Sequence, residues 1–244
     1  MSKLFVLKLG TTWPATAERH GDFDDWTTHA LGATDVPLET VDIEHGAALP
    51  EHTDCAGVIL TGSHAMVTDE LPWSVNTQVW LVDALRQQIP ILGVCYGHQL
   101  LARAAGGRVG YHPDGREIGT VEISCQPAAR QDPLFADLPD PFLAHTTHAQ
   151  SVLELPPEAE LLAGNAYEPN HAFRVGSSAW GVQFHPEYST VIMREYITGL
   201  AEQLIAAGRD IGELSVQVTD TPTPRTILRR FGAFVGEQMK TAAH

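Results

Sequence analysis

The chain has 244 residues, of which 43% are hydrophobic and 18% charged, and it carries a formal net charge of −15 at pH 7. This composition supports a sizeable core and excludes a globally disordered chain. The negative charge argues against nucleic acid or an anionic membrane surface as the main partner, because both require a basic face.

The N-terminal segment predicts a short β-strand and no targeting signal. Residues 1–10 lack the apolar core and the cleavage site of a signal peptide. No apolar stretch approaches the length of a membrane span. Three cysteines over this length do not make a disulfide framework. We therefore expect a cytoplasmic protein.

Strand-like and helix-like segments alternate over the first 105 residues. Strands are predicted over 4–9, 36–41, 57–60 and 90–94, and helices over 22–31, 74–88 and 97–105. The helix over 74–88 is expected to bury Val75, Val79, Leu81, Val82 and Leu85. This alternation predicts a parallel sheet that is covered by helices on both faces.

The second half of the chain reads as an antiparallel or mixed continuation followed by helices. Strands are predicted over 119–124, 142–144, 160–164, 171–175 and 179–184. A helix over 190–207 is expected to bury Val191, Ile192, Tyr196, Leu200, Leu204 and Ile205. Pro222 and Pro224 predict a linker before a last helix over 225–240, whose apolar stripe favours core or interface packing over a cofactor site. We expect one domain over 1–208, with a linker and helical extension over 209–244 packed on it.

Cys95 stands in a turn with glycine on both sides, within the run Gly93-Val94-Cys95-Tyr96-Gly97. A buried strand precedes this turn and a helix follows it, as in the elbow that exposes the nucleophile of many hydrolases. The free N–H groups at the start of the helix favour the thiolate, which is the reactive form of cysteine. The other two cysteines, Cys55 and Cys125, lack flanking glycines and fit the packing role of a small hydrophobe.

A second segment, Gly181-Val182-Gln183-Phe184-His185-Pro186-Glu187, ends an apolar strand on a histidine with a carboxylate two residues later. Histidine is suited to exchange protons with a cysteine nucleophile, and a carboxylate can orient the imidazole. Taken alone, this pair also fits a surface pair or a fragment of a metal site. A metal site requires a third ligand, and no compact ligand motif is present.

Together the Cys95 and His185 segments resemble the two signature segments of class I, triad-type glutamine amidotransferases. They occur in the family's order, and the resemblance extends from about residue 4 to residue 204. It is closest in style to stand-alone relatives of the glutaminase domain of GMP synthetase. The resemblance implies an α/β, flavodoxin-like, three-layer sandwich with a mainly parallel central sheet.

The resemblance also implies roles for individual residues. Cys95 is expected to attack the γ-carboxamide of glutamine, with His185 as acid and base and Glu187 as its orienter. The backbone N–H groups of Gly62 and Tyr96 are expected to form the oxyanion hole, although Thr61-Gly62 stands where the family frequently has a double glycine.

The family's substrate-binding positions fall on Gln99 and on the segment Thr147-His148-Ala149-Gln150. Gln99, Thr147 and His148 are therefore expected to bind substrate. The segment departs from the family's Ser-His-Gly-Asp pattern, so the match at Gln150 is weak and the identity of the γ-glutamyl substrate stays open.

Two enzyme functions and one non-enzymatic function remain open. The chain could release ammonia from glutamine for an acceptor on a separate synthetase subunit, or it could hydrolyse γ-glutamyl peptides or amides by the same thioester route. A binding module without catalysis is the third alternative. Neither a P-loop nor a pyrophosphatase-type nucleotide loop is present in the sequence, and no cofactor or metal is expected.

Overall fold

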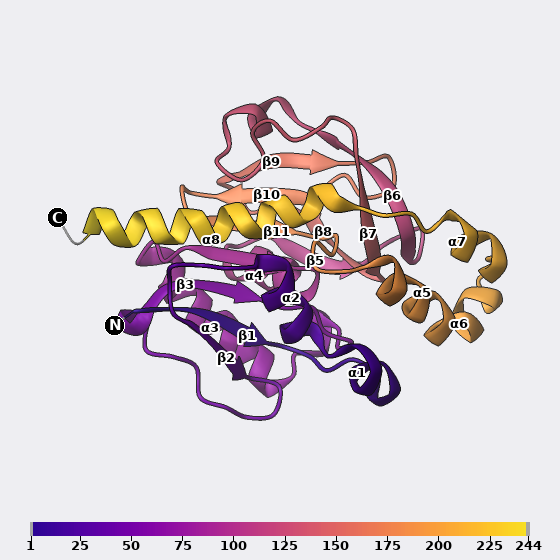
Figure 1. The fold of residues 1–244 in the computed structure, drawn as a ribbon, viewed down its shortest axis with the longest axis horizontal. Helices are drawn as coiled ribbons and strands as arrows, with labels where there is room; N and C mark the ends of the chain where they lie inside the picture. Colours follow the sequence, from indigo (N-terminus) through magenta and orange to yellow (C-terminus); the bar gives the residue numbers. More distant parts are fainter. Residues whose placement is uncertain (1, 243–244) are drawn as a thin grey trace.

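The computed structural model describes residues 2–242 (Figure 1). Its strands are β1 (Lys3–Lys8), β2 (Leu38–Asp42), β3 (Cys55–Leu60), β4 (Ile91–Val94), β5 (Arg108–Tyr111), β6 (Glu117–Cys125), β7 (Phe142–His148), β8 (Gln150–Glu154), β9 (Ala159–Gly164), β10 (Ala172–Val175) and β11 (Ala179–Val182). Its helices are α1 (Pro14–His20), α2 (Phe23–Leu31), α3 (Pro72–Arg86), α4 (Tyr96–Ala104), α5 (Thr190–Gly199), α6 (Ala201–Ala206), α7 (Ile211–Gln217) and α8 (Pro222–Ala242).

One nine-stranded sheet organises the molecule, in the order β2-β1-β3-β4-β11-β10-β9-β6-β7. The strands from β2 to β11 run parallel, and those from β10 onward pair antiparallel. Strands β5 and β8 form a separate antiparallel ribbon. The predicted α/β fold, with a parallel first half and a mixed second half, is confirmed.

Helices cover both faces of the parallel part of the sheet. In β1, Leu4 and Val6 pack into the core beneath α2 and α8, whereas Phe5 and Leu7 pack toward α3 and α4. Because the inner strands β3 and β4 are buried on both faces, their sequences are apolar throughout and do not alternate, whereas the edge strand β2 is mostly polar. Figure 1 shows α8 crossing the front of the sheet beside α2.

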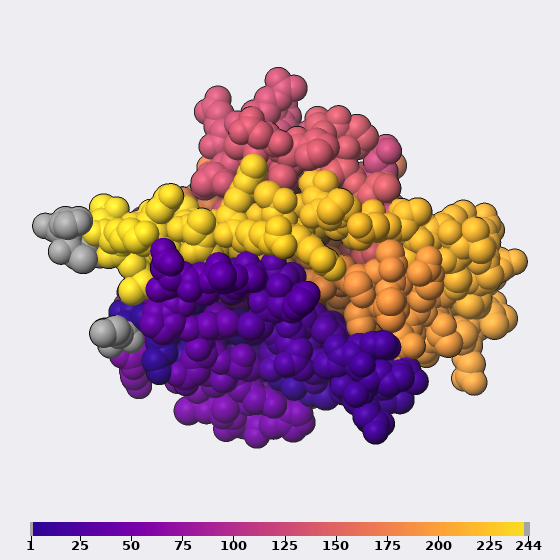
Figure 2. All heavy atoms as spheres, in the orientation of Figure 1, coloured from indigo at the N-terminus to yellow at the C-terminus, as the bar shows by residue number. Residues whose placement is uncertain are grey.

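The C-terminal helix α8 is an integral part of this core. Its residues Ile227, Leu228, Phe231 and Val235 are fully buried, which confirms that the apolar stripe serves packing. The helix approaches β3 so closely that a Cβ on Gly57 would lie 2.7 Å from Val235 Cγ2. Figure 2 shows α8 as a continuous ridge between the N-terminal elements and the β6–β9 region.

The predicted linker at Pro222 and Pro224 is wrong. Both prolines lie in the first turn of α8, where their missing N–H groups would have no helical partner in any case. The preceding stretch holds the short helix α7, which the sequence did not predict and which buries Leu214.

The predicted apolar face of α3 is partly wrong. Val75 and Val79 are exposed, while Ser74 and Thr77 are buried beside Leu81 and Ala84. The buried hydroxyl groups have partners: Tyr96 donates to Ser74 Oγ at 2.6 Å, and Thr77 donates to the Trp73 carbonyl at 2.7 Å. These hydrogen bonds make a small polar face compatible with burial.

The predicted single helix over 190–207 is also wrong. It divides at Leu200 into α5 and α6, and both Val191 and Ile205 point outward. At the division, a Cβ on Gly199 would lie 2.5 Å from the indole of Trp13, so a glycine is needed there.

Helices α1, α5, α6 and α7 gather beyond the carboxyl ends of the parallel strands, at the right of Figure 1. In an open α/β sheet this edge is where ligands bind. Among residues 2–242, no helix is both long enough and apolar enough to cross a membrane.

Candidate active site

The predicted nucleophile lies in the turn between β4 and α4. Cys95 has φ 49° and ψ −96°, a conformation that residues with a side chain rarely adopt. Its backbone N–H donates to the Val182 carbonyl at 2.8 Å, which ties the turn to β11. Local strain of this kind persists only where the surrounding structure fixes it, and it is typical of a nucleophile elbow.

The flanking glycines are required by the geometry of this turn. A Cβ on Gly93 would lie 2.4 Å from the carbonyl oxygen of Gly97, and a Cβ on Gly97 would lie 2.5 Å from Leu60 Cβ. No relaxed side chain fits at such distances. Glycine is therefore needed at positions 93 and 97 for the turn to form.

The Cys95 thiol lies at the N-terminal end of α4 and is 7% exposed. The first N–H groups of a helix have no intrahelical partner, and together with the helix dipole they favour the thiolate. The Sγ atom is 3.9 Å from the Thr147 carbonyl oxygen on β7. Burial raises the pKa of Cys55 to about 12 and that of Cys125 to about 11.

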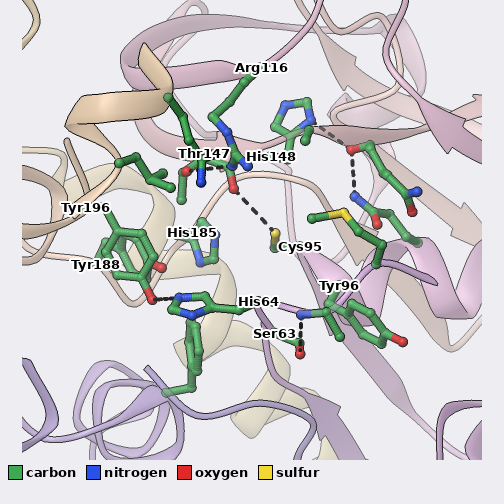
Figure 3. A pocket seen from close by; sticks show the side chains of 18 of the residues that line it. Ser63, His64, Cys95, Tyr96, Arg116, Thr147, His148, His185, Tyr188 and Tyr196 are labelled. Atoms are coloured by element: carbon green, nitrogen blue, oxygen red, sulfur yellow. Dashed lines mark hydrogen bonds between the residues drawn. The ribbon is translucent and has the colours of Figure 1, made fainter. Parts of the chain in front are cut away.

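His185 and Glu187 form a buried pair beside this thiol. The Nδ1 atom of His185 lies 2.7 Å from Glu187 Oε1, and the backbone N–H of His185 donates to the His145 carbonyl at 2.8 Å. Its Nε2 atom has no hydrogen-bond partner among residues 2–242. Figure 3 shows the His185 ring and the Cys95 sulfur in the same cavity.

Electrostatics favour the charged form of the His185 imidazole. Burial alone would lower its pKa, but the negative charges of Glu187 and of a Cys95 thiolate raise the pKa of His185 to about 10. A protonated His185 beside Cys95 is the general acid that a cysteine nucleophile requires.

Tyr188 stacks on His185, with ring centroids 3.9 Å apart and an interplanar angle of 18°. Tyr188 also packs against Tyr196, whose hydroxyl is 3.0 Å from both Thr12 Oγ1 and His64 Nε2. The sequence predicts that Tyr196 is buried, but neither Tyr188 nor Tyr196 was expected in the site. Two features of the sequence could have indicated them. Tyr188 directly follows the His-Pro-Glu motif, and Tyr196 lies at helical spacing from it.

The two predicted oxyanion residues flank the Cys95–His185 region. The backbone N–H of Tyr96 is the first of α4. A Cβ on Gly62 would lie 3.2 Å from His185 Cε1, so this glycine lies directly beside the imidazole. Thr61 fixes the end of β3 there, because its Oγ1 accepts the Leu9 N–H at 2.9 Å and donates to the Gly62 carbonyl at 3.0 Å.

The predicted substrate-binding residues line the same cavity, but most of their polar atoms are already engaged. The Gln99 amide nitrogen donates to the Gln150 carbonyl at 2.7 Å and to Gln183 Oε1 at 3.0 Å. The Gln150 side chain turns away to Thr68, to whose Oγ1 it donates at 2.5 Å. The Gln99 side-chain oxygen is therefore available to a ligand, whereas the Gln150 side chain is held by Thr68.

His148 is held at both ring nitrogens. Its Nδ1 lies 2.9 Å from the Gln150 carbonyl, and its Nε2 lies 3.1 Å from Glu117 Oε2. Glu117 also lies 3.1 Å from His171 Nε2 and accepts from Asn165 at 2.9 Å. These contacts favour a role for His148 in fixing the loop between β7 and β8.

The cavity has a volume of about 330 Å³ and combines a polar side with an aromatic side. The polar side includes Gln99, Arg116 and the 147–150 loop, and the aromatic side includes Trp13, Phe23, His64, Tyr188 and Tyr196. Burial lowers the pKa of His64, which keeps its ring neutral near pH 7. Within residues 2–242, no group of three or more histidine, cysteine, aspartate or glutamate side chains is arranged to hold a metal ion.

Comparison with known proteins places this geometry in a family. A sequence model described as "Glutamine amidotransferase class-I" matches residues 18–199, three quarters of the chain. This chain is a class-I glutamine amidotransferase family member. The resemblance carried by the Cys95 and His185 segments is thereby confirmed.

The curated relatives of this family member include GMP synthases. The Porphyromonas gingivalis GMP synthase [glutamine-hydrolyzing] is 34% identical over 170 residues, which are 68% of this chain and 32% of the relative. The Aeropyrum pernix GMP synthase is 36% identical over 152 residues, 62% of this chain and 27% of the relative. The chain thus spans about a third of the length of the curated relatives it matches.

Solved structures show the same fold. A glutamine amidotransferase from Thermotoga maritima superposes with a TM-score of 0.74 at 20% identity, covering 98% of both chains. A glutamine amidotransferase from Methylobacillus flagellatus gives a TM-score of 0.74 at 24% identity, covering 97% of this chain and 94% of the other. The predicted flavodoxin-like class I glutamine amidotransferase fold is confirmed.

Proposed function

We propose that this protein hydrolyses the γ-carboxamide of glutamine through a γ-glutamyl thioester on Cys95. The observation that carries the proposal is the combination of a thiol on a strained elbow with a buried His185–Glu187 pair at 2.7 Å in the same cavity. Membership of the class-I glutamine amidotransferase family supports the choice of glutamine.

In the first half-reaction the Cys95 thiolate adds to the carboxamide carbon. The carbonyl oxygen becomes an oxyanion, to which the N–H groups of Tyr96 and Gly62 donate. The His185 imidazolium gives its proton to the amide nitrogen, the C–N bond breaks, and ammonia leaves. Glu187 holds the imidazole in the orientation this transfer needs.

In the second half-reaction water replaces ammonia. His185, now neutral, removes a proton from water as the oxygen adds to the thioester carbon. The C–S bond then breaks, which restores the Cys95 thiolate and the His185 imidazolium and releases glutamate. The balanced reaction is glutamine plus water giving glutamate plus ammonia.

The ammonia is proposed to serve a separate synthetase polypeptide. The curated GMP synthases extend well beyond the part that matches this chain, and their name, GMP synthase [glutamine-hydrolyzing], supports a synthetase as the acceptor of the ammonia. The test combines the purified chain with a candidate synthetase. A rise in glutamate release on mixing supports the partner, and no change on mixing argues against it.

A second candidate is the hydrolysis of N-substituted γ-glutamyl amides. The observation that favours it is a further hollow next to the cavity, which shares Met66, Arg116, Ala149 and Gln203 with it and leaves room for a leaving group larger than ammonia. Faster turnover of a γ-glutamyl peptide than of glutamine, without any partner, would favour this candidate.

The shared thioester chemistry is tested with 6-diazo-5-oxo-L-norleucine, a glutamine analogue that alkylates nucleophilic thiols. The purified protein should be labelled at Cys95 only. Cys55→Ala and Cys125→Ala are matched controls that keep full labelling, because both thiols have raised pKa values. Folded protein without a label on Cys95 would overturn the proposed catalytic role.

A further inference from the structure

Arg116 places a cation in the wall of the active-site cavity. It lies in the loop between β5 and β6, is partly buried, and points toward Thr147 in Figure 3. Among residues 2–242, its guanidinium group makes one hydrogen bond, from Nη1 to Thr147 Oγ1 at 3.5 Å, which is near the limit of such a bond.

Some arginines elsewhere in the protein form ion pairs. Arg103 pairs with Glu70 at 2.8 Å, and Arg174 pairs with Asp132 at 2.9 Å. Over the described residues, Arg116 has no carboxylate within ion-pair distance. Removing a guanidinium from water without an anion is costly, and the arrangement points to an anion supplied by a ligand.

The lining of the cavity favours the same conclusion. Among the described residues that line it, none is an aspartate or glutamate, and Glu187 lies behind the His185 ring. Where the family's Ser-His-Gly-Asp pattern has an aspartate, this chain has Gln150, whose neutral side chain is hydrogen-bonded to Thr68. Within the part of the chain that the structure describes, the cavity thus offers one permanent positive charge and no carboxylate for a substrate's amino group.

Arg116 and Cys95 both contact Thr147. The Cys95 Sγ atom is 3.9 Å from the Thr147 carbonyl oxygen, and Arg116 Nη1 is 3.5 Å from the hydroxyl oxygen of the same threonine. When the acyl carbon of a substrate contacts Sγ, a short chain attached to that carbon can therefore reach the Arg116 guanidinium. The planar guanidinium can bind a carboxylate with two parallel hydrogen bonds.

We propose that Arg116 binds the α-carboxylate of the γ-glutamyl substrate and that recognition depends on this carboxylate more than on the α-amino group. The inference rests on the proposed function for the position of the acyl carbon at Cys95. It makes Arg116 a substrate-binding and specificity-determining residue, and it assigns the substrate class as γ-amides of dicarboxylic acids with a free second carboxylate.

Calorimetry on Cys95→Ala protein tests the inference without requiring turnover. The probes are L-glutamine, glutaramate, which lacks the amino group, and 4-aminobutanamide, which lacks the carboxylate. Glutaramate should bind within a few-fold of glutamine, and 4-aminobutanamide about ten- to a hundredfold more weakly, as expected for a charge-assisted hydrogen-bond pair.

In protein that carries both Cys95→Ala and Arg116→Met, the preference for the carboxylate should be lost. The affinities for glutamine and glutaramate should fall to that for 4-aminobutanamide, whose own affinity should not change. Arg116→Lys should recover part of the preference, since it keeps the charge and loses the planar fork. Arg108→Met is the control, because Arg108 is exposed and pairs with Glu154 away from the cavity.

Equal affinity for glutamine and 4-aminobutanamide, no binding of either, or an unchanged preference in Arg116→Met would each overturn the inference. Failure of the proposed function has a different signature. In that case the carboxylate preference is present in the calorimetry, but Cys95 is not labelled by the diazo-ketone and no glutamate is formed.

Discussion

The ring of Tyr188 lies face to face with that of His185, 3.9 Å away and 18° from parallel. Glu187 holds the imidazole at its Nδ1 edge, and Tyr188 covers one face of the ring. The two contacts therefore fix both the rotation of the ring in its plane and its tilt. A cation over an aromatic face is stabilised by the ring quadrupole. Tyr188 therefore acts as a positioning residue that supports the imidazolium form.

Replacing Tyr188 with leucine should lower kcat about three- to thirtyfold, which corresponds to about 0.5–2 kcal/mol of lost cation–π stabilisation. Tyr188→Phe is the matched control, because it keeps the aromatic face and removes only a hydroxyl that lacks a hydrogen-bond partner within residues 2–242. Steady-state kinetics with glutamine measures the effect. Equal kcat values for the leucine and phenylalanine variants would contradict a role for stacking.

The charge on Glu187 should set the alkaline limit of activity. The pKa of His185 is raised from 6.5 to about 10, so the imidazolium persists through neutral pH and is lost as the pH rises through about 10. Its contribution to folding stability is fully present below pH 6.5 and is lost over the same rise.

Glu187→Gln removes this negative charge and should move the alkaline limb of kcat/KM to lower pH, with a loss of activity of about a hundredfold or more at pH 7. A profile of kcat/KM against pH measures both effects. An alkaline limb that stays in place in the variant would show that Glu187 does not hold the proton on His185.

Gly97→Ala should destabilise the fold and distort the elbow. The new Cβ would lie 2.5 Å from Leu60 Cβ and 2.6 Å from the Leu60 carbonyl oxygen. Overpacking of this kind costs about 1–3 kcal/mol of the free energy of unfolding, which denaturant unfolding measures. Gly236→Ala in α8 is the control, because its Cβ would meet Val36 at an ordinary 3.7 Å and alanine favours the helix by up to about 1 kcal/mol. Equal stability of the Gly97 variant and the wild type would contradict the need for glycine in this turn.

Glu117→Gln should loosen the loop that carries Thr147 and His148. Burial opposes ionisation of Glu117, but His148 and His171 hold its pKa well below the usual range, so its contribution to stability is present above about pH 4.5 and is lost as the pH falls. Removing one partner from a buried ionic group costs about 3–5 kcal/mol. Denaturant unfolding measures the change, with exposed Glu122→Gln on the same strand as the control.

Sequence patterns located the parts of the site that depend on local chain geometry. The elbow at Cys95 follows from two glycines and a change from strand to helix, and the His185–Glu187 pair follows from a strand end and a rigid proline. Both signals are contiguous in the sequence, because the backbone turn itself brings the groups into position.

The parts that were missed depend on contacts between distant segments. Arg116 belongs to a polar, Gly-rich loop whose sequence fits a surface loop as well as a wall of the substrate pocket, and the pairing of β6 with β7 brings it to Thr147. In α3, the buried face carries Ser74, whose hydroxyl accepts from Tyr96, while Val79 is exposed, and no apolar periodicity can reveal this.

Trapping the acyl-enzyme tests whether Cys95 carries the reaction. Wild-type protein is mixed with isotope-labelled glutamine, quenched in acid within milliseconds to seconds, digested and analysed by mass spectrometry. We expect a γ-glutamyl group on the peptide that contains Cys95, and no such group in Cys95→Ala protein. When a His185→Ala variant is acylated with an activated ester, the γ-glutamyl group should persist longer than in the wild type. Glutamate formation at wild-type rates by Cys95→Ala protein, with no acyl group on Cys95 in the wild type, would contradict this role of Cys95.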